Sequence, residues 1–353
     1  MKKRKLVIDC ERMKYPHTGL YYYCLHLGNA LAALIDKEKE SLSYYVRNCS
    51  TLYFGNDAQY IVQHSLDKFY MPVKDTDVWH TTYQATNYFP FRKKSKVVFT
   101  IHDLNVVHEN NVSPAKIKKE LAKIQKRIYR ADHIIAISAF TLHDIHKHLN
   151  VGNTPITVIH NGCNFSKINT PQPPAIVAEQ PFIFTLGTIN SKKNFHVLPC
   201  LVANTQKKLY IAGVVDNEAY KQLIIEEAQK FGVENQVVFL GPISENDKQW
   251  YMQHCEAFVF PSIAEGFGLP VIEAMYFGVP VILSTLTALP EIGGDVAYYF
   301  NSFEPQQMQA DYQQALSAYN NDPTAPQKIM ERATQFSWEE AAKKYLEVYR
   351  SLY

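Results

Sequence analysis

The chain has 353 residues, of which 46% are hydrophobic and 20% are charged. This composition predicts a globular protein of about two domains, each able to bury its own core, and it excludes an intrinsically disordered chain. The formal net charge of +2 argues against a dedicated nucleic-acid binder.

The N-terminus and the cysteines indicate where the chain works. Met1 to Lys5 lead into an apolar run far too short for a signal peptide or a membrane span, so we expect a cytoplasmic protein. The six cysteines form no C-x-x-C pair and no metal-ligand spacing. We therefore expect reduced thiols, mostly buried.

The first half of the chain reads as alternating strands and helices. Lys5 to Cys10 is predicted to be a buried strand, and Leu20 opens a helical repeat of apolar residues after it. Lys96 to Ile101 is a strong strand, and His102 and Asp103 stand at its carboxyl end. An imidazole there could reach a sugar hydroxyl or a phosphate; the alternative is a histidine held by the backbone of a loop.

Two clusters invite a metal-binding interpretation. Asp75 and Asp77 form a D-x-D pair that would suit Mg²⁺ or Mn²⁺, but the pair precedes a strand, whereas ligand loops follow strands. We therefore predict a turn with solvated acids. The second cluster consists of His143, Asp144, His146 and His148. Helical geometry puts only His143 and His146 on one face, which favours a solvated helix end.

Residues from Ser113 to Arg130 predict an amphipathic helix capped by Ser113. Such a helix could lie on an anionic membrane surface, or its charged face could simply be solvated. The charged face is predicted to carry one acid, Glu120, and seven basic residues, Lys116, Lys118, Lys119, Lys123, Lys126, Arg127 and Arg130.

A proline-rich stretch, residues 171–181, reads as a linker between two domains, residues 1–170 and 182–335. The second domain is predicted to begin with a strand, Phe182 to Leu186. Lys192 and Lys193 follow in a loop before an expected helix, where they are well placed to neutralise a diphosphate.

The stretch from Ala257 to Ser284 predicts a strand, a glycine-containing loop, a helix beginning at Pro270 and a second strand. Glu265 lies in the loop and Glu273 in the expected first helical turn. Gly266 and Gly268 between them allow close backbone approach, and a glutamate there could bind a sugar diol. The alternative is a capped helix whose glutamates are solvated or stabilise its dipole.

The spelling E-G-F-G-L-P-x-x-E-A-M-x-x-G-x-P-V, from Glu265 to Val281, closely resembles the motif of GT4-type retaining glycosyltransferases. The resemblance runs from Gly19 to the C-terminus. It implies an α/β protein of GT-B architecture, with two Rossmann-like parallel-sheet domains facing a cleft and a C-terminal helix, residues 336–353, that returns to the first domain.

The resemblance also implies roles for the residues noted above. The loop at Gly19 would lie against donor or acceptor, although Tyr21 occupies a usual glycine position. His102-Asp103 would face the donor sugar. Residues Gly187 to Asn194 match the pattern G-x-x-x-x-R-K-N with Lys192 in place of arginine, so charge is kept and the bidentate fork is lost.

The implied function is transfer of a hexose, such as mannose or glucose, from a nucleotide-diphosphate sugar to a saccharide or glycolipid in bacterial surface polysaccharide synthesis. Catalysis would rest on Lys193 and Lys192 at the diphosphate, without metal or other cofactor. Glu273 would hold the ribose, while Glu265 and the backbone N–H groups of Phe267, Gly268 and Leu269 would bind the donor sugar. A nucleotide-sugar epimerase of the same fold is one alternative; an inactive glycan- or nucleotide-binding protein is another.

Overall fold

The computed structural model describes residues 2–16, 18–48, 52–73, 75–92, 95–109, 112–163, 168, 170–177 and 181–353. The chain divides into two compact units: residues 1–164 with 336–353, and residues 165–335. Residues 178–180 of the predicted linker lie outside the described residues.

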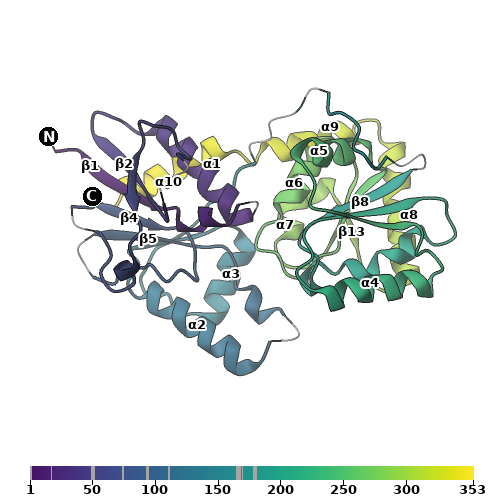
Figure 1. The fold of residues 1–353 in the computed structure, drawn as a ribbon, viewed down its shortest axis with the longest axis horizontal. Coiled ribbons are helices and arrows are strands. Elements are labelled where there is room, and N and C mark those ends of the chain that lie inside the picture. The colour runs from purple at the N-terminus through teal and green to yellow at the C-terminus, as the bar shows by residue number, and fades with distance from the viewer. Residues whose placement is uncertain are drawn as a thin grey trace. The chain divides into compact units, whose positions relative to one another are not determined.

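The first unit is built on a parallel sheet whose described strands follow the order β3-β2-β1-β4-β5-β6-β7 (Figure 1). The strand next to β1 on one side is β2 and on the other side is β4, so the chain reverses its winding direction at β1. The strands are β1 (Arg4–Asp9), β2 (Glu40–Val46), β3 (Gln59–Val62), β4 (Val78–Thr81), β5 (Lys96–Ile101), β6 (His133–Ala136) and β7 (Ile156–Val158).

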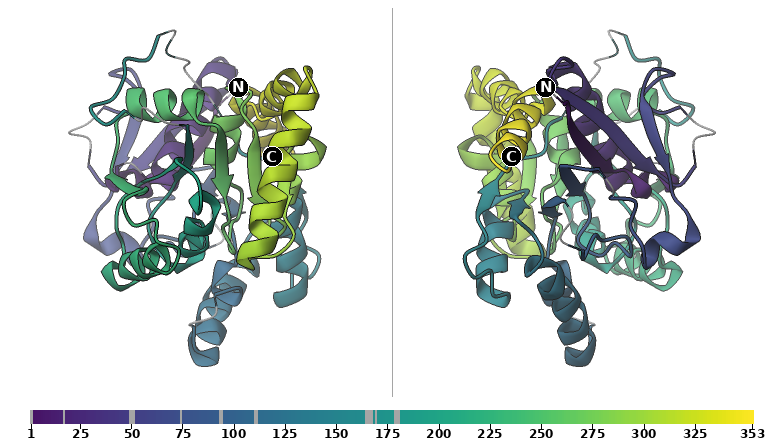
Figure 2. Two further views of the ribbon diagram at one scale, coloured as in Figure 1. Left: turned by 90° about the vertical axis from the view of Figure 1, so that its right-hand side faces the viewer. Right: turned by 90° about the vertical axis from the view of Figure 1, so that its left-hand side faces the viewer.

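The C-terminal helix α10 (Trp338–Arg350) completes the core of the first unit, as predicted. Buried side chains of α10 pack against α1 (Gly19–Leu34), and Tyr345 Oη lies 2.7 Å from Tyr23 Oη of that helix. Helices α2 (Pro114–Ile128) and α3 (Ala139–His148) follow β5 and β6, and α2 projects from this unit in both views of Figure 2. Short 3₁₀ turns are η1 (Glu11–Lys14), η2 (Ser65–Lys68) and η3 (Asn105–Val107).

The second unit repeats the architecture with a parallel sheet in the order β10-β9-β8-β11-β12-β13. Its strands are β8 (Phe182–Leu186), β9 (Lys208–Ala212), β10 (Val237–Gly241), β11 (Ala257–Phe260), β12 (Val281–Ser284) and β13 (Tyr298–Phe300). Its helices are α4 (Glu218–Lys230), α5 (Glu245–His254), α6 (Leu269–Met275), α7 (Leu289–Gly293), α8 (Pro305–Asn321) and α9 (Ala325–Thr334). The 3₁₀ turns are η4 (Ser191–Lys193), η5 (Phe195–Val197), η6 (Pro199–Val202) and η7 (Gly294–Val296).

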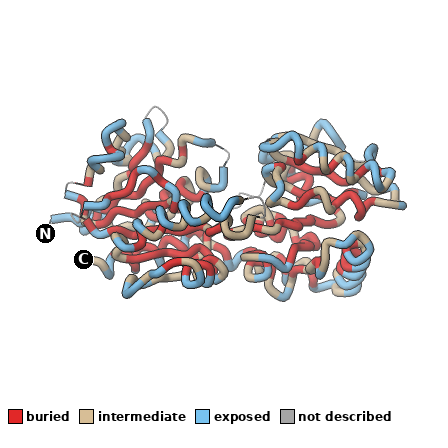
Figure 3. The backbone as a smooth tube through the Cα atoms, turned by 90° about the horizontal axis from the view of Figure 1, so that it is seen from below, coloured by how far each residue is buried: buried red, intermediate tan, exposed pale blue. Residues whose placement is uncertain are grey.

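In both units the central strands are buried on both faces, as parallel sheets covered by helices require (Figure 3). Five cysteines are described; all are free and buried, which confirms the prediction for them, whereas Cys49 lies outside the described residues. No helix within the described part of the chain is long and apolar enough to cross a membrane.

Candidate active site

The loops that follow β8 and β11 bring two predicted site residues into contact. Lys193 Nζ lies 2.5 Å from Glu265 Oε1, and the ammonium also sits 4.7 Å from the centre of the Phe260 ring. The side chains of Lys193 and Glu265 are 17% and 14% exposed, so the pair is shielded but still reachable from solvent. Because β8 and β11 are neighbours in the sheet, their loops emerge at the same carboxyl edge.

The backbone around Lys193 explains this placement. Asn194 has the left-handed conformation, with φ 57°, and ends the η4 turn. A Cβ atom at Gly187 would come within 3.0 Å of Lys193 Cε, so the glycine leaves room for the lysine. The amide of Ile263 donates to the carbonyl of Lys192 at 2.9 Å, which ties the two loops together.

The prediction of a helix after Lys193 is wrong. The chain forms the successive 3₁₀ turns η4, η5 and η6 instead, because the left-handed Asn194 interrupts any continuous helix and Pro199 opens η6. Among the described residues, no α-helix therefore follows the two lysines directly, and the charge that this loop itself brings to a ligand comes mainly from Lys192 and Lys193.

Glycine is required in the loop that carries Glu265. Gly268 adopts φ +110°, and a Cβ atom there would lie 3.0 Å from Leu289 Cδ2. The Glu265 amide donates to Thr287 Oγ1 at 3.0 Å, so the loop after β12 supports the loop after β11. Helix α6 begins at Leu269 and has only seven residues, so its dipole is short.

Glu273 lies in a second polar cluster of this unit. It is the fifth residue of α6, so the prediction that it lies in the first helical turn is wrong. Lys248 of α5 lies between two carboxylates, 2.8 Å from Glu273 Oε1 and 2.9 Å from Glu245 Oε2. Burial raises the pKa of Glu273, and the neighbouring ammonium limits that rise. Burial opposes the charge of Lys248, but the two carboxylates outweigh it and raise the pKa of Lys248.

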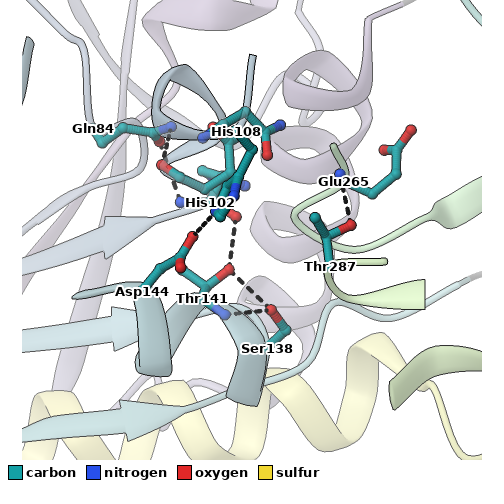
Figure 4. A network of polar contacts seen from close by, with 10 residues as sticks. Gln84, His102, His108, Ser138, Thr141, Asp144, Glu265 and Thr287 are labelled. Atoms are coloured by element: carbon teal, nitrogen blue, oxygen red, sulfur yellow. Dashed lines mark hydrogen bonds and ion pairs between the residues drawn. The ribbon is translucent and has the colours of Figure 1, made fainter. Parts of the chain in front are cut away.

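In the first unit, His102 is buried in a hydrogen-bonded network at the end of β5 (Figure 4). Its Nε2 lies 2.7 Å from the Thr82 carbonyl, which can only accept, so Nε2 carries the proton. Its amide donates to Gln84 Oε1 at 3.2 Å, and Thr141 Oγ1 donates to its carbonyl at 3.1 Å. Burial lowers the pKa of His102 to about 4, so the imidazole is neutral near pH 7.

Gly19 is the first residue of α1, and Thr18 caps that helix by accepting from the Tyr21 amide at 3.3 Å. A Cβ atom at Gly19 would meet nothing within 4 Å, so packing within the chain does not require a glycine there. The Tyr21 ring packs against Tyr22 and Tyr53, with centroids 5.2 and 6.0 Å away.

The suspected metal clusters have other roles. Asp77 binds Arg4 at 2.9 Å and accepts from the Lys5 amide at 2.8 Å, so it fixes the start of β4 rather than being merely solvated. Asp144, expected on a solvated helix end, is instead buried and lies 2.5 Å from His108 Nε2. Within the described ranges, no three His, Cys, Asp or Glu side chains are grouped so that they could hold a metal ion.

Three residues that contact the predicted site residues Lys193, Glu265 and Glu273 were not predicted from the sequence. They are Phe260, Thr287 and Lys248, respectively. Phe260 was predicted only as part of a buried strand. Thr287 adopts the left-handed conformation, with φ 56°, which a threonine in a sequence does not predict. Lys248 gave no signal because it lies 25 positions from Glu273 on another helix.

Two family models match consecutive parts of the chain. The model described as Glycosyl transferases group 1 matches residues 166–336, and the model described as Glycosyltransferase Family 4 matches residues 45–167. The chain is 25% identical to the O-antigen chain mannosyltransferase B of Escherichia coli, over 99% of this chain and 100% of that protein.

Solved structures share the fold over almost the whole chain. Sucrose-phosphate synthase from Thermosynechococcus elongatus has a TM-score of 0.75 at 19% identity and covers 99% of both chains. Anabaena HepE, solved in complex with UDP and glucose, has a TM-score of 0.75 at 17% identity and covers 99% of this chain and 100% of its own. The predicted fold of two Rossmann-like parallel-sheet units is confirmed.

Proposed function

Because the chain belongs to the GT4-type retaining glycosyltransferases, we propose that it transfers a hexose from a nucleotide-diphosphate sugar to a saccharide or glycolipid in bacterial surface polysaccharide synthesis. Mannose is the first candidate, since the relative that matches over its full length is a mannosyltransferase. The observation that carries the proposal is the shielded contact of Lys193 with Glu265 at the carboxyl edge of the second sheet.

The chemistry needs positive charge at the leaving group. Breaking the bond between the anomeric carbon and the diphosphate oxygen leaves an oxocarbenium-like sugar and a negatively charged nucleoside diphosphate. Lys193 and Lys192 would stabilise that charge. The acceptor oxygen then bonds to the anomeric carbon on the face that the diphosphate leaves, and its proton passes to the departing phosphate.

Donor binding would rearrange the pair that Lys193 forms with Glu265. A diphosphate offers the ammonium stronger charge than one carboxylate, so Lys193 would turn towards it or be shared with it. Glu265 would then be available to accept hydrogen bonds from donor sugar hydroxyls, assisted by the backbone N–H groups of residues 267–269. The buried Asn194 Nδ2, which has no acceptor among the described residues, would gain one from the donor.

The remaining predicted residues fit supporting roles. Neutral His102, with Nε2–H given to Thr82, keeps only Nδ1 as an acceptor, which suits a sugar hydroxyl rather than a phosphate. Glu273, held by Lys248, would accept from the ribose diol. We propose that no metal takes part, because the two lysines already supply charge for the diphosphate.

A donor and acceptor screen tests the function directly. Release of nucleoside diphosphate is measured with GDP-mannose and with UDP-glucose, with and without mannosylated lipid-linked acceptors, in EDTA and in Mn²⁺. We expect release that depends on acceptor and is the same in both buffers. Release only in Mn²⁺ would refute the metal-independent mechanism, and interconversion of the donor sugar without release would indicate an epimerase instead.

We further propose that α2 contacts anionic membrane lipid, with a smaller basic face than predicted. Arg127 was expected on the charged face, but it is buried and donates to the Thr86 carbonyl, and Arg130 binds the Ser95 carbonyl at 2.7 Å. The spacing explains this result, because Arg127 lies three positions after the buried Ile124. Five lysines stay exposed on α2, namely Lys116, Lys118, Lys119, Lys123 and Lys126.

Exposed aromatic side chains beside α2 favour lipid over plain solvation. Tyr129 is 68% exposed and Phe91 is 46% exposed, and the Lys126 ammonium lies 4.8 Å from the Phe91 ring centre. Aromatic rings and lysines together suit the headgroup region. Liposome co-sedimentation tests this contact.

Phosphatidylglycerol vesicles should retain the protein at low salt and release it as salt rises, whereas phosphatidylcholine vesicles should not retain it. Replacing Lys118 and Lys119 by glutamine should weaken retention. The same replacement of Lys343 and Lys344 on α10 removes equal charge and should not. Equal recovery with both vesicle types would exclude the contact.

A further inference from the structure

The carboxyl ends of β1 and β4 form a second polar site, which the proposed roles above do not use. The strands are neighbours in the sheet, and Thr82 Oγ1 donates to the Asp9 carbonyl at 2.5 Å, joining the two loops. The η1 turn follows β1 and is anchored by buried Glu11 and Met13. Backbone between these anchors is therefore fixed in place.

Arg12 lies on this anchored turn and is held between two aromatic rings. Its guanidinium carbon is 4.6 Å from the centre of the Tyr15 ring and 4.7 Å from the centre of the Tyr83 ring, which comes from the loop after β4. Arg12 Nε is buried and has no hydrogen-bond partner among the residues that the structure describes. The guanidinium is thus oriented by stacking while part of its hydrogen-bonding edge stays unused.

The surrounding charges leave Arg12 uncompensated. Glu11 is paired with Lys14 rather than with Arg12. Burial raises the pKa of Asp9 to about 8, so this carboxyl is mostly protonated at pH 7. No ion pair of Arg12 is formed within the described ranges, so a fixed cation with free donor capacity remains at the ligand-binding edge of the sheet.

The site is connected to His102. Gln84, next to Tyr83 in the chain, accepts from the His102 amide at 3.2 Å and donates to the Asp103 carbonyl at 3.1 Å. Arg12 and His102 therefore stand on strand ends that are joined by hydrogen bonds.

We propose that Arg12 is the subsite for an oxyanion, a phosphate or a carboxylate, carried by the acceptor. This proposal rests on the glycosyltransferase function, because it names the class of acceptor. The planar guanidinium matches the oxygens of either anion bidentately, and the stacking tyrosines reduce the entropy lost on binding. An acceptor sugar with a phosphate or uronate group fits, and a neutral one lacks the matching charge.

Titration calorimetry tests the subsite without turnover. The full chain carries Lys192→Ala and Lys193→Ala, which remove the two proposed phosphate contacts in the second unit. It is titrated with mannose 1-phosphate, glucuronate and methyl α-mannoside. Adding Arg12→Gln should weaken binding of an anionic sugar by at least about tenfold and leave methyl α-mannoside unchanged. Loss for mannose 1-phosphate alone identifies a phosphate, and loss for glucuronate alone identifies a carboxylate.

A matched control is Arg92→Gln, since Arg92 also lies 4.7 Å from a tyrosine ring centre, that of Tyr70. It should leave all three affinities unchanged. Two results would overturn the proposal: anionic sugars that bind with equal affinity with and without Arg12→Gln, or a chain with Arg12 intact that binds neither anionic sugar. If Arg12→Gln lowers the melting temperature, Arg12→Lys replaces it, keeping the charge and losing the fork. If the anion binds as expected but the wild-type chain releases no nucleoside diphosphate with any donor and acceptor, the transferase function is refuted and this subsite is not.

Discussion

Lys193 and Glu265 are 72 positions apart in the sequence, yet Lys193 Nζ lies 2.5 Å from Glu265 Oε1. The residue predicted to bind the diphosphate of the donor thus pairs with the residue predicted to bind its sugar. A donor must exchange this contact for its own, so removing Lys193 changes both the leaving-group site and the state of Glu265.

We expect Lys193→Ala to lower kcat by about 10²-fold or more, the scale for loss of one preorganised electrostatic group. The reason is that negative charge on the diphosphate is greatest as the anomeric bond breaks, so the lysine acts more on the transition state than on the bound donor. Steady-state release of nucleoside diphosphate measures this effect.

Lys207→Ala is the control for Lys193→Ala. Lys207 forms a similar pair with Glu256 at 2.6 Å, and its ammonium lies 5.2 Å from the Tyr312 ring centre in the same unit. Its loss should affect thermal stability in a comparable way but leave kcat unchanged. Equal kcat losses in the two variants would mean that Lys193 acts only through stability.

Lys192→Arg tests the departure from the family pattern. Arginine restores the bidentate fork without changing the net charge, so activity should be kept or improved if the side chain reaches the diphosphate. Lys192→Ala should then lower kcat. Wild-type kcat and KM in Lys192→Ala would show that the side chain does not reach the diphosphate and that position 192 contributes its backbone carbonyl, which accepts from the Ile263 amide.

The sequence predicted elements with strong periodicity and missed contacts between distant segments. The helix after Ser113 and the strand Ala257–Phe260 were identified from spacing alone, with the Ser113 cap accepting from the Lys116 amide. The strand Glu40–Val46 was not predicted, because its tyrosines and serines do not alternate cleanly between apolar and polar. The partners of Glu265 and Glu273 come from other loops and helices, which local patterns do not encode.

The pH dependence of His102 is a further test. Burial holds the pKa of His102 at about 4, whereas an unfolded histidine has about 6.5. Below pH 6.5 the unfolded chain therefore binds a proton that the folded chain does not, so the stability from neutral His102 is present above pH 6.5 and is lost as pH falls towards 4. Urea unfolding of the wild type and His102→Gln between pH 5 and 7 measures the difference.

His102→Gln should remove up to about 1.4 kcal/mol per pH unit from the slope of unfolding free energy against pH. Comparing the two proteins cancels the contribution of groups that do not interact with His102. Buried His80 does interact with it, but burial is the larger cause that lowers the pKa of His80 to about 3, and burial is kept in both proteins. Parallel curves would contradict a neutral His102. Because His102 stays neutral from pH 5.5 to 8, its ionisation should not affect kcat in this range. The pH profiles of kcat for the wild type and His102→Gln should therefore have the same shape.

The pair of Lys248 and Glu273 makes a prediction about donor affinity. Lys248→Met removes the only cation within ion-pair distance of Glu273 in the described residues, leaving burial to raise the pKa of Glu273 further. Glu245, the other group that faces this site, adds repulsion in the same direction. Glu273 is then protonated in a larger fraction of molecules than in the wild type, and this fraction grows as pH falls.

A protonated Glu273 is a weaker acceptor for the ribose hydroxyls, so donor KM in Lys248→Met should rise as pH falls. The change in kcat should be smaller, because the ribose contact is equal in the ground state and the transition state. Glu273→Gln should raise donor KM without this pH dependence, since an amide does not titrate. Lys248→Arg should restore the wild-type profile. If donor KM in Lys248→Met follows the wild type at every pH at which both proteins stay folded, or Lys248→Arg fails to rescue it, then Lys248 only packs against α6 and does not keep Glu273 ionised for the donor.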